Sequence, residues 1–346
     1  MTQENSARPR LSDRLFRLTG LLLVLASFAG AWLAMDFDSF RSTPLATGAE
    51  PISLVIKPGS SLRTVAAELR ERGVLERPLY LVMLARWQNV DGKIKAGEYA
   101  LSPGITPDKL LQQLTEGQVL QYALTLIEGE TFREMMLRVS EAPALEQTLA
   151  DHDGATVMQA IGYPGLHPEG RFLPETYHYP RSTRDVDVLR RAFRDMETLL
   201  DAEWMKREAD LPLKTPYEAL ILASIVEKET GLASERPQIA GVFIRRLRKG
   251  MRLQTDPTVI YGIGEQFDGD IRFRDLRKDT PYNTYTRAGL PPTPIAMPGK
   301  EAIHAVLHPA PGDSLYFVAR GDGSHQFSAT LGAHNRAVDK YQRKRR

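Results

Sequence analysis

Two glutamates, Glu227 and Glu229, are the side chains of this sequence best placed to do chemistry. They follow an apolar segment, residues 219–226, in which Ser224 is the single polar residue. If this segment is a helix, side chains two residues apart point about 200° from each other. The two carboxylates therefore cannot act on the same atom, and their surroundings decide which of them is the catalytic candidate.

Glu229 is the stronger candidate for a general acid. Ile225 and Val226 lie one turn before it on the same face, whereas Glu227 lies over two small residues. Apolar neighbours and the negative end of the helix dipole both disfavour a charged carboxylate, so we expect a raised pKa for Glu229. A carboxylic acid that stays protonated near neutral pH can donate a proton to a leaving group. A Glu-Lys-Glu sequence alone is also typical of a solvated helix end.

Local signals predict the helices that would position this carboxylate. Thr215 as a cap, Pro216 in the first turn and a glutamate three residues after the cap predict a helix start before the apolar segment. We expect Gly231 to end this helix. Residues 234–237 predict the start of a following helix, and apolar periodicity predicts a long helix over residues 185–211.

Two later segments, residues 254–258 and 282–285, mix hydrogen-bonding side chains with prolines and aromatic rings. Sugars present hydroxyl edges and apolar faces, so this mixture suits a glycan site. Either segment taken alone is also typical of a turn. The candidates for substrate contact here are Gln254, Thr255, Asp256, Tyr282, Asn283, Thr284 and Tyr285.

The longest apolar run, residues 18–35, carries no charged side chain. As a helix it is about 27 Å long, close to the hydrocarbon thickness of a bilayer. Arginines precede the run, and Asp36 and Asp38 follow it. The positive-inside rule therefore predicts a membrane anchor with a cytoplasmic N-terminus and everything after the run outside. A cleaved signal peptide is the alternative interpretation.

A strand-turn-helix pattern occurs twice after this run. Residues 54–56 predict a strand, followed by Gly59 in a tight turn and a helix-capping hydroxyl. Residues 124–127 predict another strand, followed by Gly129 and by Thr131, which forms a capping box with a later glutamate. The unit resembles the opening of a LysM module, a small glycan-binding fold, although a generic strand-to-helix turn has the same signature.

Composition excludes several classes of function. The chain has no cysteine, which removes disulfides, thiolate metal sites and cysteine nucleophiles. Its seven histidines show neither H-E-x-x-H nor H-x-H spacing, so we expect no metal site and no cofactor. The net charge of +2 gives no reason to expect binding to nucleic acid.

Several longer segments resemble the MltG (YceG-like) family of membrane-anchored endolytic murein transglycosylases. The resemblance covers nearly everything from about residue 52 to 340, with the segments in the family's order. The matching segments are residues 128–132, 172–177, 223–230, 233–236, 252–262, 282–285, 289–295 and 308–310.

The resemblance implies an α+β fold behind an N-terminal anchor. The expected parts are a cytoplasmic N-terminus (1–17), a transmembrane anchor (18–35), a linker (36–51), a LysM-like subdomain (52–119), a YceG-like catalytic domain (120–340) and a basic tail (341–346).

The second glutamate of the family's E-K-E motif is its catalytic acid, and this position is Glu229 here. The family match therefore agrees with the argument from the helix face. The family often has aspartate where this chain has Glu175, so a direct role for that carboxylate stays open. The further substrate-binding candidates are Glu175, Tyr177, Ser234, Arg236 and Tyr261.

The reaction that the resemblance implies is cleavage of the MurNAc-β-1,4-GlcNAc bond in nascent peptidoglycan strands, which ends glycan elongation. The product carries a 1,6-anhydroMurNAc end, and no metal or cofactor is needed. The enzyme would sit in the bacterial inner membrane with its catalytic part in the periplasm, and peptidoglycan synthases are candidate partners. Two alternatives stay open: a non-catalytic wall-binding scaffold that recruits synthases, and a hydrolase with Glu175 or Asp256 as second carboxylate.

Overall fold

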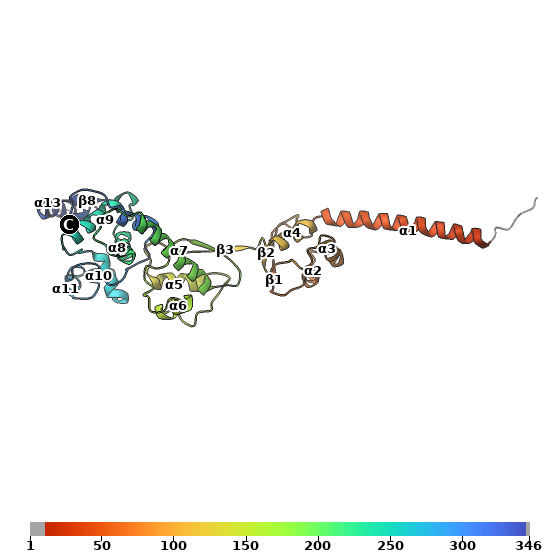
Figure 1. Ribbon diagram of the computed structural model, residues 1–346, viewed down its shortest axis with the longest axis horizontal. Helices are drawn as coiled ribbons and strands as arrows, with labels where there is room; N and C mark the ends of the chain where they lie inside the picture. Colours follow the sequence, from red (N-terminus) through yellow and green to blue (C-terminus); the bar gives the residue numbers. More distant parts are fainter. Residues whose placement is uncertain (1–10, 344–346) are drawn as a thin grey trace, which may run out of the picture. The chain divides into compact units, whose positions relative to one another are not determined.

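The structure is a computed structural model that describes residues 11–343, with side chains from residue 16 onward. The expected cytoplasmic segment therefore lies mostly outside the described residues, as does the end of the basic tail. The chain divides into two compact units, Met1–Gln121 and Tyr122–Arg346, and each is described by itself (Figure 1). Helices and short strands are mixed in both units, in agreement with an α+β class.

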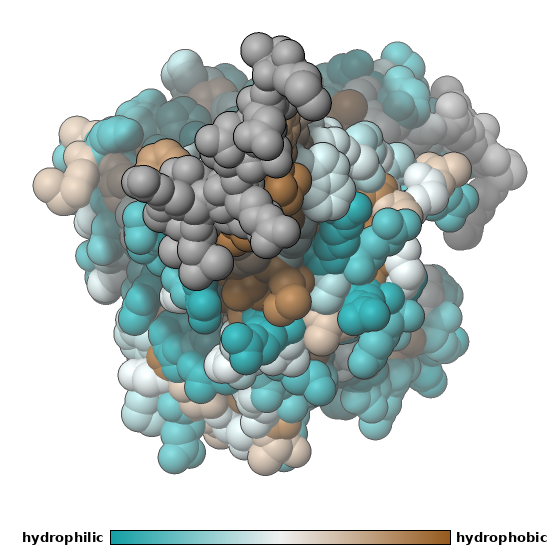
Figure 2. Space-filling model, turned by 90° about the vertical axis from the view of Figure 1, so that its right-hand side faces the viewer, coloured by the Kyte–Doolittle hydropathy of each residue, from teal (hydrophilic) through white to brown (hydrophobic). Residues whose placement is uncertain are grey.

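The first unit begins with a long helix, α1 (Leu11–Ser42), drawn in red in Figure 1. Its part Phe16–Ser42 is long and apolar enough to cross a membrane, and none of its most apolar stretch is buried. Large apolar side chains such as Phe28 and Trp32 are well exposed. In Figure 2 most of the visible surface is hydrophilic, and apolar side chains gather near the centre of the view.

Helix α1 continues to Ser42, beyond the start of the expected linker at residue 36. Its last turns are held by side-chain contacts within the same unit. Asp36 accepts hydrogen bonds from Arg77 (2.5 Å) and from the Tyr80 hydroxyl (2.9 Å). Two phenylalanines of α1, at positions 37 and 40, pack edge-on against the Tyr80 ring. These contacts explain why the segment is helical rather than an open linker.

The rest of the first unit is a small α+β body. Its strands β1 and β2 pair antiparallel, with Leu54 opposite Tyr99. Thr106 and Ser61 cap the helices that follow them, as their positions after a turn predict. The elements are β1 (Ile52–Ile56), α2 (Leu62–Glu71), α3 (Pro78–Trp87), β2 (Gly97–Leu101) and α4 (Pro107–Glu116).

The second unit opens with short strands and three helices. Thr131 and Glu134 form the predicted capping box at the start of α5. Strand β3 pairs with β5, and β4 pairs in parallel with β6. The elements are β3 (Gln121–Thr125), α5 (Phe132–Glu141), β4 (Leu145–Glu146), α6 (Gly154–Ile161), β5 (Thr176–Pro180), β6 (Thr183–Arg184) and α7 (Asp185–Met205).

The remainder of the second unit surrounds one buried helix, α8 (Pro216–Glu229). Residues 219–226 are all buried, as the apolar sequence predicts. The one polar side chain among them is satisfied: Ser224 accepts from the Ile295 backbone N–H (3.0 Å) and donates to a carbonyl of its own helix. The later elements are η1 (Ala233–Glu235), α9 (Arg236–Arg248), α10 (Asp256–Ile263), η2 (Gly264–Gln266), α11 (Phe273–Arg277), α12 (Lys300–Leu307), β7 (Tyr316–Ala319), β8 (His325–Ser328), α13 (Leu331–Val338) and η3 (Asp339–Arg343).

Two helix ends differ from the sequence prediction. Helix α7 ends at Met205 rather than at residue 211, and Asp210 beyond it adopts a left-handed backbone with φ of 61°. Helix α8 is ended by Thr230 in extended conformation rather than by Gly231. The Thr230 hydroxyl accepts the backbone N–H of Leu232 (3.0 Å), which stabilises this sharp exit.

Candidate functional site

Glu229 is the last residue of α8 and is only partly exposed. The hydroxyl of Thr255, at the start of α10, donates a hydrogen bond to its Oε1. Burial raises the pKa of Glu229 to about 7, and the negative charge of Asp256 acts in the same direction, while the hydrogen bond from Thr255 opposes both. The rise in pKa expected from the apolar helix face is confirmed. At neutral pH about half of these carboxyl groups carry a proton.

Arg246 and His325 lie near this carboxyl group and oppose the rise in its pKa. Arg246 of α9 is buried, and it donates to the carbonyls of Leu315 and Leu253, both at 2.6 Å. His325 of β8 lies within ion-pair distance of Glu235, with Nδ1 and Oε2 2.7 Å apart. Both Arg246 and His325 favour the charged form of Glu229 electrostatically. The site therefore holds a carboxyl group poised between its two protonation states.

Hydroxyl groups connect the two segments that the sequence singled out. Thr284 accepts the backbone N–H of Thr255 (3.1 Å), and its hydroxyl lies 2.9 Å from that of Thr258. The Tyr285 hydroxyl donates to Asp256 Oδ1 (2.6 Å). Burial raises the pKa of Tyr285, so this phenol is protonated at any physiological pH. The two segments are thus one structure beside Glu229.

The backbone next to Thr255 is strained at Gln254. Gln254 adopts a left-handed conformation with φ of 51°, which is uncommon for a residue with a long side chain. Its backbone N–H donates to the carbonyl of Thr284 (3.2 Å), and this bond holds the turn. The Gln254 side chain is exposed and extends from a fixed backbone next to the carboxyl group.

A cleft of about 710 Å³ opens beside α10. The rings of Tyr261 and Tyr282 form one wall and meet edge-on, with centroids 4.8 Å apart. Lys228 and Pro257 also line the cleft, and each is next in sequence to a residue of the Glu229 cluster. Glu229 itself does not line it. The full lining is Thr131, Arg133, Glu134, Glu169, Lys228, Pro257, Ile260, Tyr261, Gly264, Glu265, Phe267, Tyr282 and Ile295.

Glu169 is a residue of this cleft that the sequence analysis missed. It is 4% exposed, and its two oxygens accept from the backbone N–H of Phe132 (2.8 Å) and from the Tyr261 hydroxyl (2.9 Å). Burial raises the pKa of Glu169 to about 7. The sequence signal that could have identified Glu169 is its position, as an acidic residue, inside a segment rich in prolines and aromatic residues. Glu169 holds the Tyr261 wall of the cleft against the start of α5.

Glu227 is engaged differently from Glu229. It accepts from Arg236 (3.1 Å) and from the backbone N–H of Gly299 (3.0 Å), and its side chain is 6% exposed. Arg236 also lies 3.7 Å from Glu128. A side chain at Gly299 would meet the carboxyl group of Glu128, which would have to move away from Arg236. The structure therefore brings Arg236 to Glu227 rather than to Glu229.

Four other sequence candidates lie apart from the Glu229 cluster or are already bonded. Asn283 is buried, and its amide donates to three carbonyls, of which that of Lys278 is nearest at 2.7 Å. The buried Tyr177, on β5, donates its hydroxyl to the backbone carbonyl of Leu173 in the preceding loop (2.9 Å). Glu175 and Ser234 are exposed, and neither is hydrogen-bonded to Glu229 or its partners in the described chain.

The sequence matches known proteins over most of its length. The sequence model of the YceG-like family matches residues 54–340. A protein of Bacillus subtilis (strain 168) named endolytic murein transglycosylase is 31% identical over 308 residues, which cover 84% of each chain. A Streptococcus pneumoniae (strain R6) protein of the same name is 27% identical over 88% of this chain, which spans 61% of that relative.

A solved structure gives the same relationship. A crystal structure of a yceG-like protein from Listeria monocytogenes is similar to this chain with a TM-score of 0.51 and 29% sequence identity. The match covers 84% of this chain and 99% of the other.

Proposed function

The chain belongs to the YceG-like family, and on this premise we propose that it is an endolytic murein transglycosylase. It cleaves the MurNAc-β-1,4-GlcNAc bond within nascent glycan strands and leaves a 1,6-anhydroMurNAc end, which terminates elongation. One observation carries the proposal: a shielded carboxyl group with a pKa of about 7, Glu229, stands at the end of a buried helix among hydrogen-bonding side chains.

The reaction needs only one protein carboxyl group. Protonated Glu229 gives its proton to the glycosidic oxygen as the bond from C1 to that oxygen breaks. The resulting carboxylate accepts the proton of the C6 hydroxyl of the same MurNAc, and O6 bonds to C1. Glu229 ends protonated as it began, and no water is consumed. A hydrolase would instead need a second carboxylate to act as nucleophile or to activate water.

The neighbours of Glu229 have distinct tasks in this mechanism. Thr255 fixes the carboxyl group and, with Arg246, steadies its charged state after the proton has left. Asp256, held by Tyr285, places a negative charge where positive charge develops on the sugar ring. The Tyr261 and Tyr282 rings offer apolar faces to a sugar of the same strand, and the exposed Gln254 offers an amide to its hydroxyls.

The test is digestion of glycan strands by the detergent-solubilised protein, followed by mass spectrometry. Anhydro products are expected, and products heavier by one water would show a hydrolase. Glu229→Gln keeps the shape of the side chain but cannot donate a proton, so the rate should fall by about 100-fold or more. Glu208→Gln is the matched control, since this exposed glutamate is not among the candidate site residues, and its rate should be nearly unchanged. Full activity of Glu229→Gln would rule out Glu229 as the acid, whereas no glycan cleavage by the unchanged chain would favour a non-catalytic scaffold.

The apolar helix supports a membrane location for this activity. We propose that residues 18–35 cross the cytoplasmic (inner) membrane once, with residues 1–17 in the cytoplasm and the remainder in the periplasm. The length and exposure of Phe16–Ser42 support a span. A reporter fused after residue 346 that is active only in the periplasm tests the orientation. Release of the protein from washed membranes would instead indicate a cleaved signal sequence.

Residues 52–119 are proposed to be a LysM-like glycan-binding subdomain of this enzyme. The strand, glycine turn and capped helix at its opening support this, because LysM modules begin in the same way. Peptidoglycan synthases remain proposed partners, since glycan elongation and its termination act on the same strand. Retention of the chain on insoluble peptidoglycan, compared with a chain lacking residues 52–119, measures the contribution of this subdomain.

A further inference from the structure

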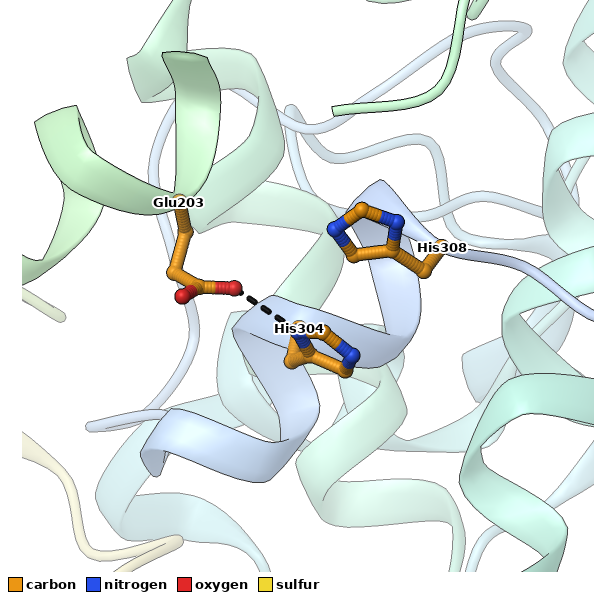
Figure 3. A group of neighbouring side chains, drawn as sticks. All are labelled: Glu203, His304 and His308. Carbon is orange, nitrogen blue, oxygen red and sulfur yellow. Dashed lines mark hydrogen bonds and ion pairs between the residues drawn. The ribbon is translucent and has the colours of Figure 1, made fainter. Parts of the chain in front are cut away.

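A second group of chemically able side chains lies outside the proposed catalytic site. Glu203 near the end of α7, His304 on α12 and His308 just after α12 bring one carboxylate oxygen and two imidazole nitrogens within 4.8 Å of one another (Figure 3). His304 Nδ1 is 2.7 Å from Glu203 Oε2. The two imidazole rings have centroids 4.3 Å apart and are tilted by 33°.

We propose that these three side chains bind a divalent transition metal ion, for which Zn²⁺ is the best chemical match. Two imidazoles and one carboxylate form a ligand set that zinc accepts, with water as the fourth ligand. His304 and His308 are four residues apart, so both can face one ion from the same side of a helix. The pair matches neither H-E-x-x-H nor H-x-H, because residue 305 is alanine and the two histidines are four residues apart.

The ligand atoms need only small movements to enclose an ion. Zinc–ligand bonds of 2.0–2.2 Å in a tetrahedron place the ligand atoms about 3.3 Å apart. The Glu203–His304 pair must therefore open by about half an ångström, while His308 moves closer. The His308 ring is half-exposed and, within residues 11–343, has no hydrogen-bond partner that would hold it back.

One competing cation stands nearby. Lys206 Nζ lies 4.0 Å from Glu203 Oε1, but its side chain is 71% exposed. Such a pair is weak and easily displaced. Glu203 itself is only 9% exposed and accepts from His304 on its other oxygen, so its orientation is fixed. The cluster is therefore partly organised before any ion binds.

A bound ion would join the end of α7 to α12. Ala302, Ile303 and Val306 of α12 share one apolar core with Leu220 and Ala223 of α8. The metal site would thus stabilise the scaffold of α8 without contacting Glu229. The effect we expect is on stability, with activity retained when the metal is removed.

The experiment uses the full chain in detergent after chelator treatment, titrated separately with Zn²⁺ and Co²⁺. Zinc at about 100 times its Kd should raise Tm by roughly 5–10 °C. Cobalt should give the visible absorption bands of a four-coordinate ion. His304→Ala, a change at an exposed side chain, should weaken binding by at least about tenfold, and His308→Ala should do the same. Glycan cleavage by the metal-free protein should be unchanged in both variants.

His178→Ala is the matched control, because this exposed histidine lies on β5 and is not part of the cluster. It should bind both ions like the unchanged chain. Three results would overturn the proposal: no rise in Tm with zinc, cobalt spectra typical of the hydrated ion, or undiminished binding by His304→Ala and His308→Ala. Equal loss of binding in His178→Ala would show adsorption to surface histidines instead.

Discussion

Replacing Thr255 by valine should move the pH dependence of glycan cleavage to higher pH. The Thr255 hydroxyl donates a hydrogen bond to Glu229 and lowers its pKa, against the burial that raises it to about 7. A hydrogen bond to a charged group contributes about 1.5–3 kcal/mol, and one to a neutral group about 0.5–1.5 kcal/mol. The difference of roughly 1.4 kcal/mol corresponds to about one pKa unit.

The direction follows from the role of the proton. Activity requires protonated Glu229, so the rate should fall as the pH rises through about 7. Without the hydrogen bond the pKa of Glu229 becomes about 8. At pH 8 the protonated fraction then rises from about one tenth to about one half, a gain of about fivefold relative to the rate at low pH. Initial rates from pH 5 to 9, each set normalised to its acidic plateau, measure this shift.

Two further variants test whether Glu229 is the acid. Thr258→Val removes a buried hydroxyl that bonds the Thr255 carbonyl and does not touch Glu229, so its pH profile should stay in place. Asp256→Asn removes a negative charge that raises the pKa of Glu229, so the rate of this variant should begin to fall at a lower pH. An acid at position 229 would be contradicted if the pH at which the rate falls were unchanged in Thr255→Val, or if it moved in the same direction in Thr255→Val and Asp256→Asn.

Three predictions concern stability. Because burial raises the pKa of Glu229 from 4.5 to about 7, its ionisation lowers the free energy of unfolding by up to about 3 kcal/mol as the pH rises through this range. In calorimetry, Glu229→Gln should therefore have a higher Tm than the unchanged chain at pH 8 but not at pH 4.5. Tyr261→Phe leaves one oxygen of Glu169 without its donor, and denaturant unfolding should show a loss of about 1–3 kcal/mol. Arg236→Ala leaves the charge of buried Glu227 without its cationic partner, which should cost about 3–5 kcal/mol in the same measurement. Adding Glu227→Gln to Arg236→Ala removes the unpaired charge and should recover part of this loss, and no recovery would contradict a charge-based cause.

The helix that carries Glu229 could be predicted because its signals are local. A cap, a proline in the first turn and an uninterrupted apolar run determine where α8 starts and that it is buried. Its final residue was missed by one position, because Thr230 leaves the helix in extended conformation before the glycine is reached. Helix α7 also ends earlier than predicted, at Met205, and the chain after it includes the left-handed residue Asp210 before α8 begins.

The surroundings of Glu229 were only partly predictable. The segments that carry Thr255 and Tyr285 were chosen for composition, and the structure joins them through Thr284. Arg246 stands in a run of basic residues that is typical of a solvated helix face, yet it is buried and bonded to backbone carbonyls. Nothing in the local sequence distinguishes it from the arginines beside it, because its burial depends on the packing of β7 against α9.

Some candidates chosen by composition or family match have their hydrogen-bonding capacity used within the protein. Asn283 donates its amide hydrogens to three carbonyls of one turn, and one nitrogen of Arg236 pairs with two glutamates, although its buried Nε has no partner among the described residues. Their roles as substrate contacts stay predictions, and both are well suited to hold the loops around α8. Residue type indicates which bonds a side chain can make, whereas the fold decides which of these bonds remain for a ligand.

The distribution of bonded carboxylates favours a reaction in which the sugar supplies its own nucleophile. Glu227 is tied to Arg236 and a backbone N–H, and both oxygens of Glu169 accept hydrogen bonds from the protein. Asp256 is exposed and fixed by Tyr285, and its charge keeps Glu229 protonated. If Asp256 activated water, its replacement by asparagine would abolish turnover. If Asp256 acts only through its charge, the same variant still forms anhydro products, and only the pH at which the rate falls is changed. The identity of the product, rather than the loss of rate, therefore separates the two mechanisms.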